Sequence, residues 1–284
     1  MRCSRSSAGS ARSSSTPSRW PGRNHDLVLH ARVADYDPAW CEELLYERRE
    51  LFEAYNKGLC LLPTSELPWF RASSRSVKAP RILAENAEAA EQVLERIRAE
   101  GPLSTLDFER GPPVDSFWAP TNVARAVLEA YAVTGVLGLA RRDGNRRYYD
   151  LVERLFPGDL LAREVPPREQ LRHKLLSRVR AHGLLGISGS AELWLGIGFA
   201  KPNPKRPEHP ARSELRGELV QDGELVPVEL EGVRGKRFVL REEVELLAAS
   251  EPPPSVTFLA PLDSLVWDRD LLRSLFDFDY LWEV

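Results

Sequence analysis

Two stretches of this 284-residue chain repeat one pattern. Residues 124–151 and 211–240 each begin with Ala-Arg and continue as a helix-like segment that closes just before a glycine, Gly135 or Gly223. Each then changes to a period of two on both sides of a basic turn, which is typical of a hairpin. The spacing between the stretches is about one small domain, so the sequence predicts a duplicated helix-plus-hairpin unit.

The first copy carries signals for three helices ahead of its hairpin. Residues 86–101 have an asparagine cap and a terminal glycine around an apolar face, and residues 104–107 predict the start of a shorter helix. Thr121 opens a third helix that ends near residue 135, and VLGLARRDGNRRYYDL predicts two strands joined at Asp143-Gly144. Three helices followed by a hairpin is the order of a winged helix-turn-helix module.

The second copy follows the same order. Residues 168–183 predict a helix with Leu171 and Leu175 on its buried face, and a second short helix begins at Ser190. The Pro-rich EPPPS stretch marks its end. We therefore predict an α+β fold, mostly helical, of tandem winged helix-turn-helix domains, with complete units at residues 84–166 and 167–252.

Basic side chains surround both predicted wings and recognition helices. Charge on hairpin edges is common because it prevents strand addition, but its occurrence at equivalent places in both copies favours contact with DNA phosphates. The candidate DNA-binding residues of the two units are Arg125, Arg141, Arg142, Arg146, Arg147, Arg212, Lys236 and Arg237.

Composition argues against several other classes. A net charge of −3 argues against a protein that coats nucleic acid through overall charge. The five histidines and three cysteines show no metal-ligand spacing, so we expect no cofactor and no metal. No apolar run approaches the roughly 20 residues that a membrane span needs, so we expect no membrane partner.

Two further segments carry specific expectations. Residues 47–63 resemble an amphipathic helix with Leu51, Phe52 and Tyr55 facing inward. Near the C-terminus, Asp263 and Asp268 stand among dense apolar residues. A glycosidase-like carboxylate pair is one interpretation of this composition. A buried aspartate that holds an arginine in a core is the interpretation we favour.

The chain resembles the winged-helix DNA glycosylases related to AlkZ and YcaQ. The resemblance rests on RNHDLVLHARVADYDPAWCEELLYERRELFEAYNKGLCLLP, GPLSTLDF, the first hairpin block and FLAPLDSLVWDRDLLRSLFDFDYLWEV, and it spans residues 23–284. It implies three tandem winged-helix domains followed by a C-terminal extension. Residues 23–83 would then be a remnant of the first domain, and residues 253–284 the start of a truncated extension.

The resemblance also implies a function. Proteins of this kind are monofunctional glycosylases that hydrolyse the N-glycosidic bond of bulky N7-alkylated purines and unhook interstrand crosslinks. The implied partner is damaged double-stranded DNA, bound by a monomer in the bacterial cytoplasm at the nucleoid. Arg23, His25 and Arg32 complete the set of candidate DNA-binding residues.

One departure puts the chemistry in question. The activity of the family depends on a Gln-x-Gln or Gln-x-Asp motif just ahead of the segment matching Arg23, and SSSTPSRWPG stands there instead. GC-rich codons for residues 13–21, read two nucleotides later, give Gln-Leu-Asp-Pro-Ile-Ala-Val-Ala. We therefore expect residues 1–22 to be an out-of-frame leader and the chain as written to lack glycosylase activity.

Other readings of this departure remain open. Residues 1–22 also have the composition of a disordered tail or a transit peptide. The competing function is a non-enzymatic winged-helix DNA-binding protein or transcriptional regulator.

Overall fold

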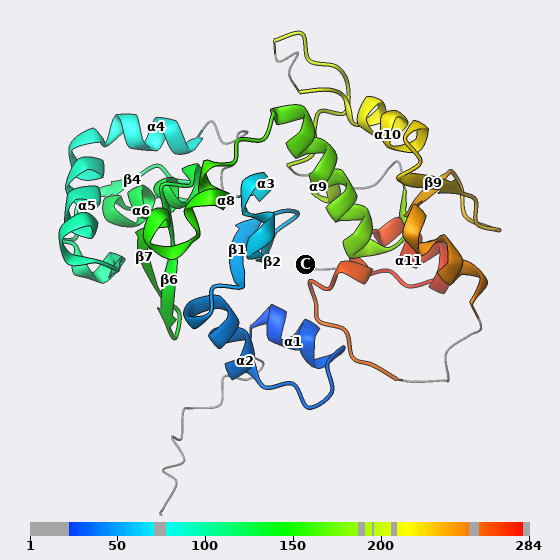
Figure 1. The fold of residues 1–284 in the computed structure, drawn as a ribbon, viewed down its shortest axis with the longest axis horizontal. Helices are drawn as coiled ribbons and strands as arrows, with labels where there is room; N and C mark the ends of the chain where they lie inside the picture. Colours follow the sequence, from blue (N-terminus) through cyan, green and yellow to red (C-terminus); the bar gives the residue numbers. More distant parts are fainter. Residues whose placement is uncertain are drawn as a thin grey trace, which may run out of the picture.

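The structure is a computed structural model that describes residues 23–70, 78–186, 191–194, 196–205, 209–249 and 256–280. Its elements form three groups, with the N-terminal group between the other two (Figure 1). Helices alternate with small antiparallel sheets, which confirms the α+β class. The prediction for residues 1–22 lies outside the described residues.

The N-terminal group contains short helices and one hairpin. Its elements are α1 (Asn24–His30), α2 (Pro38–Glu42), the π-helical turn η1 (Glu43–Glu47), β1 (Leu51–Tyr55), β2 (Leu59–Pro63), the 3-10 turn η2 (Thr64–Glu66) and α3 (Leu67–Phe70).

The prediction of an amphipathic helix over residues 47–63 is wrong, because β1 and β2 form an antiparallel hairpin there. Phe52 and Ala54 alternate into the core, as strand residues do, whereas Tyr55 is exposed. The Asn56-Lys57-Gly58 turn is closed by a 2.9 Å bond from the Asn56 amide to the Gly58 carbonyl. The spacing of the apolar residues is compatible with a helix and with a strand. The tight turn at residues 56–58 is compatible only with the hairpin.

The second group contains the first predicted copy. Its elements are α4 (Lys78–Glu85), α5 (Ala87–Glu100), β3 (Leu103–Ser104), the 3-10 turn η3 (Thr105–Asp107), β4 (Pro113–Val114), β5 (Thr121–Asn122), α6 (Val123–Thr134), β6 (Leu137–Asp143), β7 (Arg146–Leu151), α7 (Val152–Leu155) and α8 (Gly158–Ala162). Strands β3, β7 and β6 form one sheet in that order.

Most elements of this copy were predicted correctly, with three corrections of detail. Ser104 and Asp107 do form a capping box, but they start a single 3-10 turn and not a helix. The hairpin turn lies one residue later than predicted, because Asp143 pairs with Arg146 and Gly144 takes a φ of 60°. Asn122, and not Thr121, caps α6 by accepting from the Ala124 amide.

The third group contains the second predicted copy and the C-terminal segment. Its elements are α9 (Pro167–His182), β8 (Leu185–Gly186), the 3-10 turn η4 (Ala191–Trp194), α10 (Arg212–Gln221), β9 (Leu225–Val228), β10 (Arg237–Leu240), the 3-10 helix η5 (Arg241–Ala248), the 3-10 turn η6 (Ser264–Val266) and α11 (Arg269–Phe276). The short helix predicted from Ser190 is the turn η4, and Ser190 itself lies outside the described residues.

The second and third groups share one topology. In each, a helix leads into a short strand, a 3-10 turn follows, and a second helix runs into a two-stranded hairpin. The short strand pairs with the second strand of the hairpin in both sheets, β3-β7-β6 and β8-β10-β9. The repeat seen in the sequence is therefore a repeat of chain path.

The two copies differ in what covers the helix before the hairpin. Helix α6 is packed on two sides. One side contacts the core formed with α5 and the β3-β7-β6 sheet, and the other contacts Ala79 and Ile82 of α4. Helix α10 buries only one face, through Leu215 and Leu219. The predicted domain boundary between residues 83 and 84 falls inside α4, which belongs structurally with the second group.

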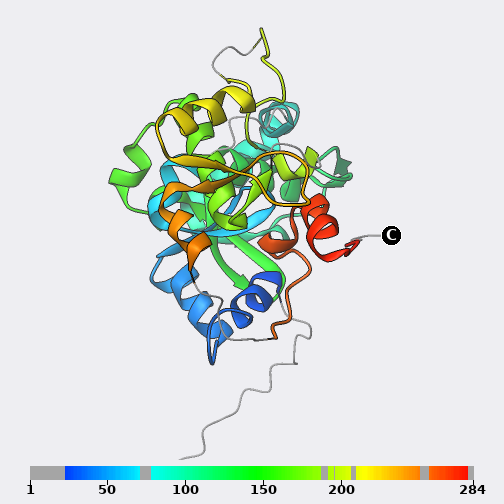
Figure 2. The same cartoon turned by 90° about the vertical axis from the view of Figure 1, so that its right-hand side faces the viewer.

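The N-terminal hairpin joins the groups into one body. Its Phe52 packs against Phe156, which follows α7, with ring centroids 6.0 Å apart. On the other side, the buried Arg178 of α9 donates to the Asn56 side chain at 2.7 Å and also to the Leu193 carbonyl. The rotated view shows the C-terminal segment beside α1 (Figure 2).

Candidate functional site

Helix α1 contains no fully buried side chain; Leu29 packs against the cluster of Tyr36, Cys41 and Leu45, and polar contacts hold the rest of the helix. Tyr36 donates its hydroxyl hydrogen to Asp26 at 2.9 Å, and the Leu262 amide donates to the Asn24 side chain at 3.1 Å. Arg23 donates to the Gly144 carbonyl at the tip of the β6–β7 hairpin at 3.3 Å. The start of the described chain therefore lies where all three groups meet.

A nearly buried ion pair connects the hairpin β1–β2 to the second group. Arg142 of β6 donates from two nitrogens to the two carboxylate oxygens of Glu53, at 2.9 and 2.6 Å. The Tyr46 hydroxyl also donates to Glu53 at 3.3 Å, and burial together with the Glu53 charge raises the pKa of Tyr46 to about 12. Because its lone pairs are occupied by these donors, Glu53 acts as a structural anion.

His25 stands beside these groups on α1. Burial lowers the pKa of its imidazole, and the nearby Asp26 carboxylate only partly offsets that effect. The ring is therefore neutral at neutral pH, and its Nε2 lies 3.6 Å from a carboxylate oxygen of Asp26. His25, Arg23, Glu53 and Arg142 are thus neighbouring polar side chains at the start of the described chain.

Arg49 fixes the same junction through backbone groups. The pairing of β6 with β7 is interrupted by an irregularity between Leu139 and Arg141. Arg49 donates to the carbonyls of Leu139 and Ala140 at 3.1 and 2.6 Å, and its own backbone has a φ of 55°. Its guanidinium thus satisfies carbonyl groups at the bulge.

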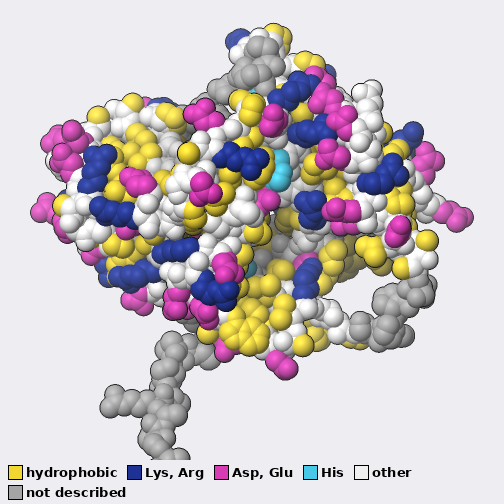
Figure 3. Space-filling model, in the orientation of Figure 1, with side chains coloured by type: hydrophobic (Ala, Val, Ile, Leu, Met, Phe, Trp, Pro, Cys, Tyr) yellow, Lys and Arg dark blue, Asp and Glu magenta, His cyan; other side chains and the backbone are white. Residues whose placement is uncertain are grey.

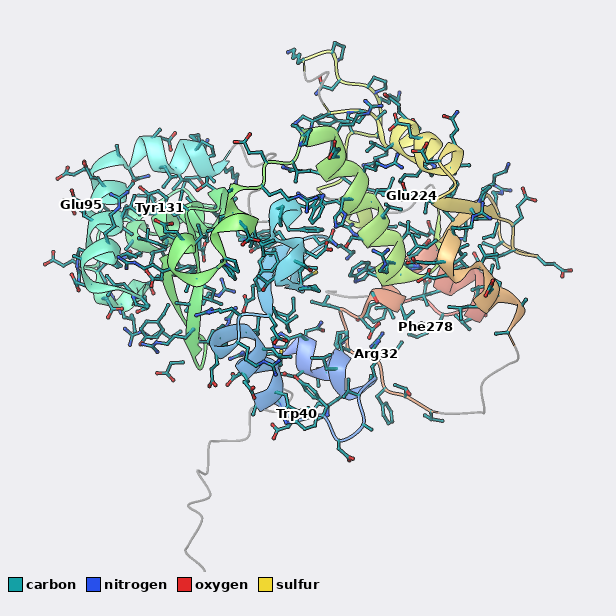
Figure 4. The ribbon with its side chains drawn as sticks, in the orientation of Figure 1. Arg32, Trp40, Glu95, Tyr131, Glu224 and Phe278 are labelled. Carbon is teal, nitrogen blue, oxygen red and sulfur yellow. The ribbon has the colours of Figure 1, made fainter. Side chains whose placement is uncertain are left out.

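The two C-terminal aspartates each hold an arginine, so the favoured interpretation of that segment is confirmed. Asp263 is fully buried and accepts two hydrogen bonds, of 2.7 and 2.8 Å, from Arg32. Figure 4 shows Arg32 at the end of α1, next to the C-terminal segment. Asp268 is buried against Arg237 of β10.

The arginines of the first wing have different surroundings. Arg141 is exposed and stacks its guanidinium carbon 3.4 Å from the Tyr148 ring centroid. Arg146 donates to Ser104 at 2.7 Å and to Asp107 at 2.9 Å, while Arg142 is taken up by Glu53. Arg147 is half-buried beside Arg142 in the paired register.

The remaining sequence-predicted residues are spread over two groups. Arg125 is exposed on α6 and pairs with Glu129 at 3.0 Å. Lys236 is exposed just before β10, whereas its neighbour Arg237 is buried. Arg212 is half-buried on α10. The structure therefore brings Arg23 and His25 close to Arg142 and the other arginines of the first wing, and leaves Arg32, Arg125, Arg212, Lys236 and Arg237 at separate places.

Charge on the visible face follows this dispersed pattern. Lysine and arginine side chains alternate with aspartate and glutamate side chains over the face drawn in Figure 3, in keeping with a net charge of −3. Ion pairs account for many of these neighbours.

Sequence reasoning missed two residues of these sites, Glu53 and Arg49. Both were hidden by the prediction of a helix over residues 47–63.

In the part of the chain that the structure describes, no three His, Cys, Asp or Glu side chains gather as metal ligands. No helix within the same ranges has both the length and the apolar character of a membrane span.

Comparison with known proteins gives one family and one structure. A family model described as DNA glycosylase AlkZ-like matches residues 15–284. The solved structure of the Streptomyces sahachiroi DNA glycosylase AlkZ is similar at 20% identity, with a TM-score of 0.48. That similarity covers 81% of this chain and 62% of the Streptomyces sahachiroi protein. This chain therefore spans less than two thirds of the length of that protein.

Proposed function

The chain belongs to the AlkZ-like DNA glycosylase family, and from this premise we propose that it is a DNA-repair protein that binds damaged double-stranded DNA. The observation that carries the proposal is the family match over residues 15–284. We further propose that it binds as a monomer.

Residues 84–166 and 167–252 are the proposed winged-helix domains. The support is their shared topology, in which a short strand pairs with the second strand of a hairpin that follows a helix. The hairpins β6–β7 and β9–β10 are then the wings. Residues 23–83 would belong to a first domain, with the hairpin β1–β2 as the corresponding wing.

DNA contact by this protein is proposed to be local. Arg141 and Lys236 are exposed beside the two wings, whereas Arg32, Arg142 and Arg237 are held by carboxylates. The exposed residues are the better candidates for phosphate contacts, because a paired arginine must lose its partner before it can bind a phosphate.

The chemistry of the family explains what this chain lacks. Alkylation at N7 places a positive charge on the purine, so the base is a good leaving group and little acid catalysis is required. A side chain must then hold water near C1′ and stabilise an oxocarbenium-like sugar. The chain has no glutamine before Arg23. We propose that the 284-residue chain binds DNA but does not excise bases.

The test compares two proteins on one duplex that contains an N7-alkylguanine. The first is the chain as written, and the second carries Gln-Leu-Asp-Pro-Ile-Ala-Val-Ala directly ahead of the segment that begins at Arg23. We expect both to bind the duplex and only the second to release the base. Base release by the chain as written overturns the proposed inactivity.

The competing function is a non-enzymatic regulator, and the missing motif is the observation in its favour. A regulator binds one DNA sequence far more tightly than others, whereas a repair protein responds to the lesion. Equal affinity for damaged and undamaged duplex, combined with strong sequence preference, would favour the regulator. Absence of duplex binding would reject both.

A further inference from the structure

The helices α6 and α10 occupy the same place in the two copies and carry different charges. Each carries the arginine of the shared Ala-Arg in its first turn, Arg125 in α6 and Arg212 in α10. One helical turn later, α6 has Glu129, which pairs with Arg125 at 3.0 Å. The corresponding residue of α10 is Arg216. The oppositely charged pair of α6 is therefore replaced by two positive charges in α10.

Arg212 and Arg216 lie on one side of α10 against aromatic rings. Residues four apart share a helix face, so the two guanidinium groups are neighbours. The guanidinium carbon of Arg212 lies 5.3 Å from the Trp194 ring centroid, and that of Arg216 lies 5.3 Å from the Phe238 ring centroid. The rings fix both side chains without neutralising them.

Within the described residues, neither arginine has a carboxylate at ion-pair distance. The acidic side chains of the same helix, Glu214 and Glu218, face the other side and are both bound by Arg168 of α9. Helix α10 is thus divided lengthwise into a positive edge and a neutralised acidic edge.

The electrostatics of the positive edge are unfavourable in the free protein. Burial lowers the pKa of Arg212, and burial together with the Arg212 charge lowers the pKa of Arg216. Two partly desolvated like charges repel each other, and an anion between them would relieve that repulsion.

The strip beside the arginines is open to a large ligand. Ser213 and Gly217 are exposed on it, and a Cβ built at Gly217 would meet no described atom within 4 Å. Short side chains permit close approach of another backbone. Helix α6 has no equivalent surface, because α4 covers it.

We propose that Arg212 and Arg216 form a phosphate-binding site that takes adjacent phosphodiesters of a DNA strand. Guanidinium groups suit this ligand because each presents a planar fork of donors to phosphate oxygens. The site rests on the proposed function and makes it more specific: the third group, through α10, binds the backbone that the second group cannot reach with α6.

The experiment measures duplex affinity over a series of salt concentrations for the full chain and for Arg212→Gln, Arg216→Gln and the double variant. Each lost phosphate contact reduces the slope of log affinity against log salt by roughly 0.9. We expect that reduction for each single variant and about twice it for the double variant. Arg96→Gln is the control, because Arg96 is a half-buried arginine, like Arg212 and Arg216, but is already paired with Glu100 four residues away.

A fourth variant gives an opposite readout. Arg216→Glu recreates the arrangement of Arg125 and Glu129, so it is expected to raise the midpoint of thermal unfolding while it weakens DNA binding. If Arg216 had only a structural role, the substitution would lower both the unfolding midpoint and the DNA affinity. The proposal is overturned if the double variant keeps the salt slope of the wild type, or if Arg96→Gln changes it equally.

Failure of the proposed function is distinguishable from failure of this site. If the wild type shows no duplex binding, the proposed function is rejected, and inorganic pyrophosphate becomes the probe. A rise in the unfolding midpoint with pyrophosphate in the wild type, absent from the double variant, would still support the anion site. No difference between the two proteins would overturn it.

Discussion

Asp263 and Arg32 lie 231 residues apart in the sequence and meet through two hydrogen bonds of 2.7 and 2.8 Å. The neighbouring Leu262 amide bonds to Asn24 at the other end of α1. Two consecutive C-terminal residues therefore hold both ends of a helix that has no fully buried side chain of its own. The position of α1 is therefore fixed in part by the C-terminal segment.

Replacement of Asp263 by alanine is expected to lower the free energy of unfolding by about 1–3 kcal/mol. The loss stays below that of a fully buried pair because the Arg32 side chain is 38% exposed. Urea unfolding measures it, and hydrogen exchange should rise first in residues 24–33. Asp279→Ala removes an exposed partner of Arg273 and serves as control. If Asp263→Ala and Asp279→Ala lowered the free energy of unfolding equally, the stabilising role of the Asp263–Arg32 pair would be contradicted.

Replacement of Arg49 by alanine is expected to cost about 2 kcal/mol, because the Leu139 and Ala140 carbonyls lose their donor at the bulge. The lysine variant should recover only part of this loss, since one ammonium group cannot copy the fork. Arg48→Ala is the matched control, because Arg48 is half-exposed and forms surface pairs with Glu43 and Glu50. A small effect at Arg49 would show that water replaces it.

His182 makes stability depend on pH. Burial lowers the pKa of this buried ring below its ordinary 6.5, with Asp268 opposing that shift and Arg237 adding to it. As pH falls below 6.5, the unfolded chain takes up a proton that the folded chain does not, so stability decreases towards the lower pKa. His182→Asn should flatten unfolding free energy against pH in that window. An unchanged slope would contradict this assignment.

Two glycines near the proposed phosphate site predict opposite effects on stability. Gly198 has a φ of 38°, and a Cβ there would lie 2.8 Å from the Pro210 carbonyl oxygen, so Gly198→Ala should destabilise by about 1–3 kcal/mol. Gly217 lies inside α10 with open space beside it, so Gly217→Ala should stabilise by about 0.5–1 kcal/mol. Thermal unfolding of both variants checks the signs.

The long, strongly periodic elements were predictable from the sequence. Helices α5 and α6 and the hairpin β6–β7 combine an apolar period with caps or a turn, and each was found within a residue or two of its predicted limits. The hairpin β1–β2 was missed because a short apolar run fits both helix and strand periods. Only pairing across the Asn56–Gly58 turn resolves that ambiguity.

The candidate sites were less predictable, because the partner of an arginine is a tertiary property. Nothing in the local sequence of Arg142 indicates Glu53, and nothing beside Arg237 indicates Asp268. The segment around Asp263 and Asp268 was different, since carboxylates within a dense apolar run must be buried with a partner. That rule predicted the type of partner and left its identity to the fold.

The packing of α4 against α6 limits which side chains α6 can carry. Ala126 and Ala130 face α4 with no exposure, so their methyl groups occupy space that no larger side chain can enter without displacing that helix. Substitutions along this face of α6 are therefore constrained by volume, whereas the corresponding edge of α10 has open space at Gly217. In one copy of the duplicated unit this helix belongs to the interior, and in the other it lies partly at the surface.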